Sequence, residues 1–301
     1  MRLLDSIFVL RPTLMFPLIT MILAGHFHAD VRHPMSWDRW LMLMVALCAM
    51  FGLGYLLNQF KDRVSDKSNG KLFLITEGYV DRRHALILSV LLSLLVLIAL
   101  LAAGFERLLL YVVLMFVVGG ILYNYTPVAL QNSPFGGVTA GFAGGFLLLF
   151  LGGLIAGEPG SFLWMPPYLI AFGSACTLTC LLDVKGDRIS GKNTFAVVYG
   201  VKKTMVIALT GFILTIIWGL FNRDWMITLS AVVSTPFLFW GCLNDNVNKA
   251  VLANKLAIFI LSCVVGIAYP AYLFAIALYL PLARWYYSRR LGIRYPSFSG
   301  R

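Results

Sequence analysis

The stretch LILSVLLSLLVLIALLAA occupies residues 86–103 and contains no charged residue. A helix of about 20 apolar residues spans the hydrocarbon core of a bilayer, whereas a surface helix of a soluble protein combines an apolar face with a polar one. Comparable uncharged runs recur along the chain, at residues 108–121, 135–157 and 206–220. The sequence therefore predicts an all-α, polytopic membrane protein.

The composition of the whole chain fits this prediction, with 60% hydrophobic residues and a mean hydropathy of +0.84 over 301 residues. No low-complexity or charged stretch divides the chain, so we expect a single transmembrane domain covering residues 1–301, with no cleaved signal peptide. The apolar runs predict about nine membrane-spanning helices. These cover residues 12–29, 38–60, 84–103, 107–126, 135–156, 162–182, 203–220, 225–243 and 255–280.

The net charge of +11 is concentrated in loops. Basic residues gather after the second and the sixth predicted spans, which places both loops on the cytoplasmic side by the positive-inside rule. A basic tail follows the last predicted span and would face the opposite side, so either the tail lies along the lipid headgroups or the number of spans is wrong by one. No nucleic-acid-binding motif is present, so nucleic acid is not an expected partner. The basic residues of the tail are Arg284, Arg289, Arg290, Arg294 and Arg301.

Acidic and amide side chains form two short clusters at the ends of apolar helices, in a chain with only 13 Asp and Glu. The first cluster is NQFKDRVSD, with Asn58, Asp62 and Asp66, and the second is DVKGD, with Asp183 and Asp187. Residues four apart lie on one face of a helix, so each cluster predicts a ladder of oxygen ligands. Crowded carboxylates need a cation, and Mg²⁺ takes oxygen ligands and bridges phosphates. These five residues are therefore the predicted metal ligands.

Lysine and arginine side chains interleave with the acidic residues of both clusters. Acidic residues alone indicate an ion site, whereas a mixture with Lys and Arg indicates a metal ion together with phosphate that the basic side chains bind directly. The alternative is that both clusters are ordinary solvated helix ends, which the scarcity of acidic residues in a membrane protein argues against. The predicted phosphate-binding residues are Lys61, Arg63, Lys67, Lys71, Lys185, Arg188 and Lys192.

The spacing N-x-x-x-D-x-x-x-D after the second span and D-x-x-x-D after the sixth resembles the UbiA superfamily of intramembrane prenyltransferases. The likeness covers nearly the whole chain, including RPT at residues 11–13 and DVKGDRISGKNTFAVVYG after the sixth span. It implies a ring of helices around a central cavity. The ring would lie among membrane lipids, and the site would face the cytoplasm. It also implies Mg²⁺-dependent binding of a prenyl diphosphate and prenyl transfer to an aromatic, quinone-precursor-type or related lipid acceptor. The resemblance gives catalytic roles to Asp62, Asp66, Asp183 and Asp187, and adds Arg11 and Asn58 to the substrate-binding residues.

Two departures from the family pattern leave the acceptor open. Many members carry Arg-Pro shortly after the first motif, where this chain reads GKLFLITEG, and a basic residue after a YTP-like turn, where it reads VALQNSPF. Within YNYTP, Pro127 ends the fourth span, so Tyr123 and Tyr125 are expected at the cytoplasmic mouth. Their rings are candidates to stabilise an allylic carbocation.

Other functions stay open from the sequence alone. An intramembrane terpene cyclase would use the same diphosphate site, with the cation attacking its own tail. A cation or phosphate transporter would place its binding groups near the middle of the bilayer on broken helices, and the position of the clusters at helix ends argues against it. The histidines of HFHADVRH, which are His26, His28 and His33, are expected in a solvated loop opposite the clusters.

Overall fold

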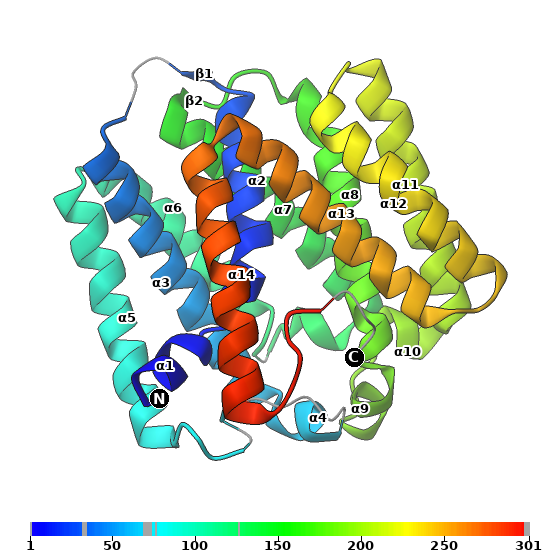
Figure 1. Ribbon diagram of the computed structural model, residues 1–301, viewed down its shortest axis with the longest axis horizontal. Helices are drawn as coiled ribbons and strands as arrows, with labels where there is room; N and C mark the ends of the chain where they lie inside the picture. Colours follow the sequence, from blue (N-terminus) through cyan, green and yellow to red (C-terminus); the bar gives the residue numbers. More distant parts are fainter. Residues whose placement is uncertain (1, 32–34, 69–73, 76, 126, 298–301) are drawn as a thin grey trace.

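Helices form nearly all of the regular structure (Figure 1). The computed structural model describes the chain apart from residues 1, 32–34, 69–73, 76, 126 and 298–301. The prediction of an all-α membrane protein is confirmed. The α-helices of the first half are α1 (Arg2–Phe8), α2 (Met15–Phe27), α3 (Trp37–Lys61), α4 (Arg63–Ser68), α5 (Arg82–Ala102) and α6 (Glu106–Phe116). Those of the second half are α7 (Pro134–Ala156), α8 (Met165–Thr179), α9 (Val184–Ile189), α10 (Phe195–Tyr199), α11 (Val201–Phe221), α12 (Trp225–Leu243), α13 (Val247–Ala268) and α14 (Pro270–Leu291).

Short elements connect these helices. The strands β1 (Asp30–Val31) and β2 (Gly157–Glu158) pair antiparallel and tie the chain after α2 to the end of α7. A π-helical turn, η2 (Val117–Leu122), continues α6. The 3₁₀ turns are η1 (Pro12–Leu14), η3 (Leu130–Asn132), η4 (Phe162–Trp164) and η5 (Cys180–Leu182).

Within the described residues, 8 helical stretches are long and apolar enough to cross a membrane, which supports an integral membrane protein. The first of them joins α1, η1 and α2, and the chain bends inside it at Arg11, where φ is 53°. The predicted span 107–126 corresponds to α6 and η2 and is not among the eight. The stretches cover Leu3–Phe27, Trp37–Lys61, Arg82–Ala102, Pro134–Ala156, Phe162–Leu182, Val201–Phe221, Trp225–Leu243 and Val247–Ala268.

The boundaries of the last predicted span, 255–280, are wrong. The helix stops at Tyr269, where φ is −126° and ψ is 76°. Pro270 causes the break, because proline has no N–H to donate and disfavours a helical conformation in the residue before it. The chain therefore reverses direction, and α14 runs back along the bundle (Figure 1).

The return of α14 places the basic C-terminal helix end beside the N-terminus. The guanidinium of Arg290 donates to Asp5 Oδ2 at 2.8 Å, and the hydroxyl of Tyr286 donates to Asp5 Oδ1 at 2.6 Å. Figure 1 shows the N-terminus, α4, α9 and the end of α14 at one end of the bundle. Helix α14, which is not among the eight membrane-spanning candidates, thus returns the basic tail to the end of the bundle that carries the N-terminus.

Glycines allow helix backbones to touch in the interior. A Cβ on Gly25 of α2 would overlap the backbone of Leu149 on α7, and a Cβ on Gly152 of α7 would overlap the carbonyl of Ile22 on α2. Small residues at such crossings let membrane helices approach closely. The pair α2–α7 is fixed in this way, and it positions the chain segment that leads into α2.

At the end opposite the acidic motifs, His28 is not the solvated residue expected from the sequence. His28 Nε2 lies 3.0 Å from Asp224 Oδ2 and 3.0 Å from the Tyr168 hydroxyl, and its ring stacks on Trp164 with centroids 4.5 Å apart. The residue joins the chain after α2 to α8 and to the start of α12. His33 lies outside the described residues.

Candidate active site

The first acidic motif begins in the last turn of α3 and continues into α4. Helical backbone bonds run through it, because the Asp62 N–H donates to the Asn58 carbonyl at 2.9 Å and the Asp66 N–H donates to the Asp62 carbonyl at 2.8 Å. The Asn58 side-chain amide also donates to Asp62 Oδ2 at 3.0 Å. The spacing of four residues therefore places Asn58 and Asp62 side by side.

The second motif begins where η5 leads into α9. The Asp187 N–H donates to the Asp183 carbonyl at 2.8 Å, and the Thr194 hydroxyl donates to Asp187 Oδ2 at 3.2 Å. Asp187 is buried, with 4% of its surface exposed. Helices α4 and α9 contact each other, and Figure 1 shows them at the same end of the bundle. The fold therefore brings together two motifs that are more than a hundred residues apart in the sequence.

Lys192 links the two motifs directly. Its ammonium group lies 2.6 Å from Asp62 Oδ1 and donates to Gln131 Oε1 at 3.2 Å. The chain reaches this position after Gly191, whose φ of 73° turns it back toward α9. A basic residue from the second motif thus neutralises a carboxylate of the first.

Arg11 provides a second cation at the first motif. Its Nη2 lies 3.4 Å from Asp66 Oδ2, and the two side chains are only 13% and 7% exposed. Arg11 itself has a left-handed backbone conformation, which is uncommon for a residue other than glycine, and the rigid ring of Pro12 follows it. The bend between α1 and α2 is what directs this arginine at the motif.

Two buried amides that the sequence analysis did not identify support the site. The Asn58 amide donates to Asn124 Oδ1 at 2.8 Å, and the Gln131 amide donates to the Asn124 carbonyl at 3.4 Å. Asn124 is 1% exposed and Gln131 is 5% exposed. Both follow the π-turn η2, a conformation that often marks functional sites. The only signal for these two residues in the sequence was their amide type beside the apolar run of α6. That signal does not reveal which residues they contact.

The predicted tyrosines lie close to the motifs. Tyr123 is within electrostatic range of Asp62 and Asp187, and Tyr125 donates a hydrogen bond to the Leu57 carbonyl at 3.2 Å. The structure does not bring the other predicted basic residues to the carboxylates. In the part of the chain that is described, they are exposed and form no ion pair: Lys61, Arg63, Lys67, Lys185 and Arg188. Lys71 lies outside the described residues.

The donor groups of the two motifs are of the chemical types that bind a divalent ion. Carboxylate and amide oxygens are the ligands that Mg²⁺ prefers, and the ion commonly completes its shell with water and substrate phosphates. No three His, Cys, Asp or Glu side chains converge into a complete ion site within the described residues. Instead, Lys192 and Arg11 place positive charge at Asp62 and Asp66, where the charge of an ion would be needed. Each motif therefore offers part of a coordination shell.

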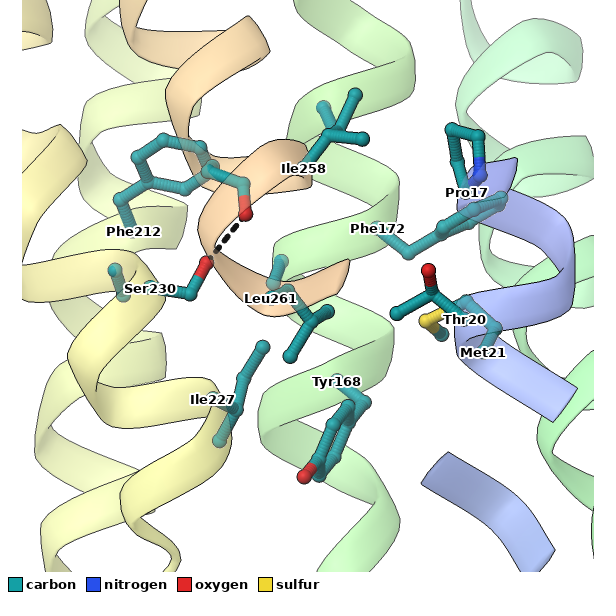
Figure 2. Close-up of a pocket in the computed structure, with 14 residues that line it drawn as sticks. Pro17, Thr20, Met21, Tyr168, Phe172, Phe212, Ile227, Ser230, Ile258 and Leu261 are labelled. Carbon is teal, nitrogen blue, oxygen red and sulfur yellow. Dashed lines mark hydrogen bonds between the residues drawn. The ribbon is translucent and has the colours of Figure 1, made fainter. Parts of the chain in front are cut away.

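A small apolar pocket of about 40 Å³ lies between α2, α8, α11, α12 and α13 (Figure 2). Phe172, Ile258 and Leu261 line it, and the hydroxyl of Ser230 is used internally, because it donates to the Ala257 carbonyl at 2.7 Å. Of the helices that line the pocket, α8 continues through η5 to the second motif. The pocket wall includes Ala175, and the next residue, Cys176, is within electrostatic range of Tyr123 and Tyr55.

Comparison with known proteins identifies relatives of both sequence and fold. The sequence profile of the UbiA prenyltransferase family matches residues 18–250. The digeranylgeranylglyceryl phosphate synthase of Methanobrevibacter smithii is 31% identical over 156 residues, which are 46% of this chain and 51% of that protein. The chain therefore matches only about half the length of this curated relative.

Solved structures show the same fold. A UbiA homolog from Archaeoglobus fulgidus bound to GPP and Mg²⁺ superposes with a TM-score of 0.66 at 16% identity, over 90% of this chain and 99% of that one. A structure concerning digeranylgeranylglyceryl phosphate synthase in membranes superposes with a TM-score of 0.59 at 16% identity, over 88% and 96% of the two chains. At this identity the likeness concerns the fold.

Proposed function

Because the chain belongs to the UbiA prenyltransferase family, we propose that it transfers a prenyl group from a prenyl diphosphate to a lipid acceptor within the membrane. The observation that carries this proposal is the contact between the two acidic motifs, with Lys192 of the second motif paired to Asp62 of the first at 2.6 Å. Such a site has carboxylates for a divalent ion and cations for phosphate in one place.

We assign the metal-binding role to the oxygens of Asn58, Asp62, Asp66, Asp183 and Asp187. When bound, Mg²⁺ would supply positive charge that makes diphosphate a better leaving group. Lys192 and Arg11 are protein groups that, like Mg²⁺, carry positive charge. They contact Asp62 and Asp66, so they would lie within reach of a diphosphate held at the motifs.

The reaction breaks the allylic C–O bond, and its electron pair leaves with the diphosphate. A new bond forms between the allylic carbon and the acceptor, which loses a proton. Water must be kept away from the electron-deficient carbon. The prenyl tail would lie along apolar helix faces of the bundle. The ring of Tyr123, which is within electrostatic range of Asp62 and Asp187, would stabilise the electron-deficient carbon by a cation–π contact worth about 0.5–2 kcal/mol.

We propose a lipid acceptor rather than a quinone precursor in particular. The curated relative is a digeranylgeranylglyceryl phosphate synthase, whose name indicates a glyceryl phosphate lipid. The basic loops at the motif end of the bundle would attract an anionic headgroup, and from the positive-inside rule we propose that the site faces the cytoplasm.

The test is an incubation of purified protein with Mg²⁺, prenyl diphosphates of several lengths, and either a glyceryl phosphate lipid or an aromatic acceptor, followed by mass spectrometry. An acceptor-dependent adduct is expected, and Asp62→Asn and Asp183→Asn should abolish it without unfolding the protein. Asp245→Asn is the control, since Asp245 lies on the surface with its side chain 62% exposed. A cyclised hydrocarbon formed without acceptor would overturn the assignment to transfer, and full activity in both motif variants would overturn the site.

A further inference from the structure

Helix α14 is fixed along the N-terminal segment by tyrosines seven residues apart. The hydroxyl of Tyr272 lies 2.7 Å from that of Thr20, the hydroxyl of Tyr279 lies 2.7 Å from that of Thr13, and Tyr286 donates to Asp5 at 2.6 Å. Rings add to this contact, since Phe8 stacks on Tyr286 with centroids 3.8 Å apart. The end of α14 is therefore held in register with the bend that carries Arg11.

The chain leaves α14 through Gly292 and folds back over the bundle. Gly292 has a φ of 69°, a left-handed conformation that glycine adopts without strain. Residues 293–297, which we call the C-terminal strap, have no regular secondary structure and cross from the end of α14 in the direction of α13 (Figure 1). Ile293 and Tyr295 pack against the apolar cluster around Phe8, and the Tyr295 ring meets Tyr287 edge-on at 4.9 Å.

The strap lies beside Arg11 at one end and contacts α13 at the other. Tyr295 interacts with the Thr13 hydroxyl and lies within electrostatic range of Arg11, the residue that pairs with Asp66. At its other end, the Ser297 carbonyl accepts a hydrogen bond from Lys255 of α13 at 2.9 Å. The strap therefore bridges the N-terminal bend and α13 next to a cation of the site.

We propose that the C-terminal strap closes the motif end of the site, with Tyr295 seated against Thr13 and Arg11 so that water is excluded while the allylic C–O bond breaks. The inference rests on the proposed function, because a closed site matters most for a reaction with an electron-deficient carbon. The strap can open without breaking regular secondary structure, because it has no backbone ladder and is held by side-chain packing of Tyr295 and by the Lys255–Ser297 hydrogen bond. Opening would admit the diphosphate, and closing would bring Tyr295 back onto the bend at Arg11.

If the strap only anchored α14, its loss would change the stability and the reaction products in a different way. Loss of an anchor lowers the stability of the protein and all activities together. Loss of a closing element changes the fate of the prenyl group, because water reaches the reactive carbon and yields a prenyl alcohol in place of the acceptor adduct. The ratio of these two products therefore separates the two roles.

The variants are Tyr295→Ala and a chain that ends after Arg294. Arg294→Ala is the matched control, since Arg294 is the exposed neighbour of Tyr295. We expect the ratio of prenyl alcohol to acceptor adduct to rise at least about tenfold in both variants and to stay at the wild-type value in the control. An unchanged ratio in Tyr295→Ala and in the shortened chain overturns the proposal.

A second measurement does not depend on turnover. A cysteine introduced by Ser297→Cys, in a protein whose five native cysteines are replaced by alanine, reports how often the strap opens through its rate of thiol labelling. Mg²⁺ with inorganic diphosphate should slow the labelling, and Tyr295→Ala should speed it whether or not diphosphate is present. If neither change occurs, the strap does not close the site. If labelling responds as expected while no prenyl diphosphate is consumed, the proposed transfer reaction fails and the strap remains.

Discussion

Replacing Lys192 by methionine should change metal binding and catalysis in opposite directions. The lysine ammonium lies 2.6 Å from Asp62 Oδ1, so it occupies the carboxylate oxygen that a divalent ion would need. Methionine keeps a long apolar side chain but has no charge. The variant therefore removes a competitor for the ion and, at the same time, a cation for the diphosphate.

The magnitude follows from the geometry of the pair. Unit charges at the 2.6 Å separation of this pair attract each other by about 6 kcal/mol at an effective dielectric constant of about 20. Desolvation offsets most of this, and a pair whose side chains are 13% and 12% exposed has a net value of about 1 kcal/mol. Ion binding in the absence of diphosphate should therefore become about fivefold tighter. Loss of one charged hydrogen bond to diphosphate, worth about 1.5–3 kcal/mol, should lower kcat/KM about 10- to 100-fold.

Calorimetric titration of the purified protein with Mg²⁺ or Mn²⁺ measures the first effect, and prenyl transfer by the same preparation measures the second. Lys202→Met is the control, because Lys202 pairs with Asp245 at 3.4 Å on the surface, where both side chains are more than 60% exposed. Weaker ion binding in Lys192→Met would refute the competition, and transfer at the wild-type rate would show that the lysine does not reach the diphosphate.

Three further substitutions test the parts that support the site. Gln131→Leu removes the neutral acceptor of Lys192 and should slow transfer about three- to tenfold with little change in ion affinity, which kinetics and calorimetry together would show. Gly25→Ala should lower the free energy of unfolding by about 1–3 kcal/mol, measured in detergent, because the added methyl overlaps the backbone of α7. Asp224→Ala should cost about 1–2 kcal/mol of stability, since Asp224 caps α12 through two backbone N–H groups and pairs with His28. Burial favours the neutral form of Asp224, but contacts with His28 and Tyr168 still hold its pKa below the ordinary value, so the wild-type advantage over the alanine variant should be present near neutral pH and disappear as the pH falls below about 3.9.

Each of these variants has a control at a nearby residue of the same kind. Asn132 is the exposed neighbour of Gln131, Gly54 of α3 has open space where a Cβ would point, and Asp245 forms only a surface pair. Alanine at Asn132 and Gly54, and asparagine at Asp245, whose left-handed backbone disfavours alanine, should leave activity and stability near the wild-type values. Equal losses in a variant and its control would indicate that the substitution acts through general destabilisation.

The sequence predicted the membrane helices well where an apolar run ends in charged residues, and poorly where two runs adjoin. Residues 255–280 were read as one span, because Tyr269 is compatible with an apolar run and no charge separates α13 from α14. Pro270 was the available signal, since proline is favoured at the first position of a helix and breaks the helix before it. The unexplained charge of the tail was the consequence of this missed boundary.

Helical periodicity explains which predicted site residues face one another. Asn58 and Asp62 are four residues apart and share a face, whereas Lys61 and Arg63 are adjacent to Asp62 and turn about 100° away from it. Interleaving in the sequence therefore does not mean that each cation contacts the carboxylates, and binding of phosphate by Lys61 and Arg63 stays a prediction. Lys192 reaches Asp62 only because a glycine turn returns the chain after α9, and no spacing rule predicts such a contact.

The position of Arg11 depends on the last helix of the chain. The bend that carries this arginine is strained, and strained backbone persists only where surrounding contacts hold it. Thr13, two residues later, is held by Tyr279 of α14 and contacted by Tyr295 of the strap. The family profile ends at residue 250, so these contacts come from a part of the chain outside the shared pattern. If the proposed function holds, the acidic motifs would hold the diphosphate, while α14 and the strap would determine how Arg11 is presented to it and how the site is closed.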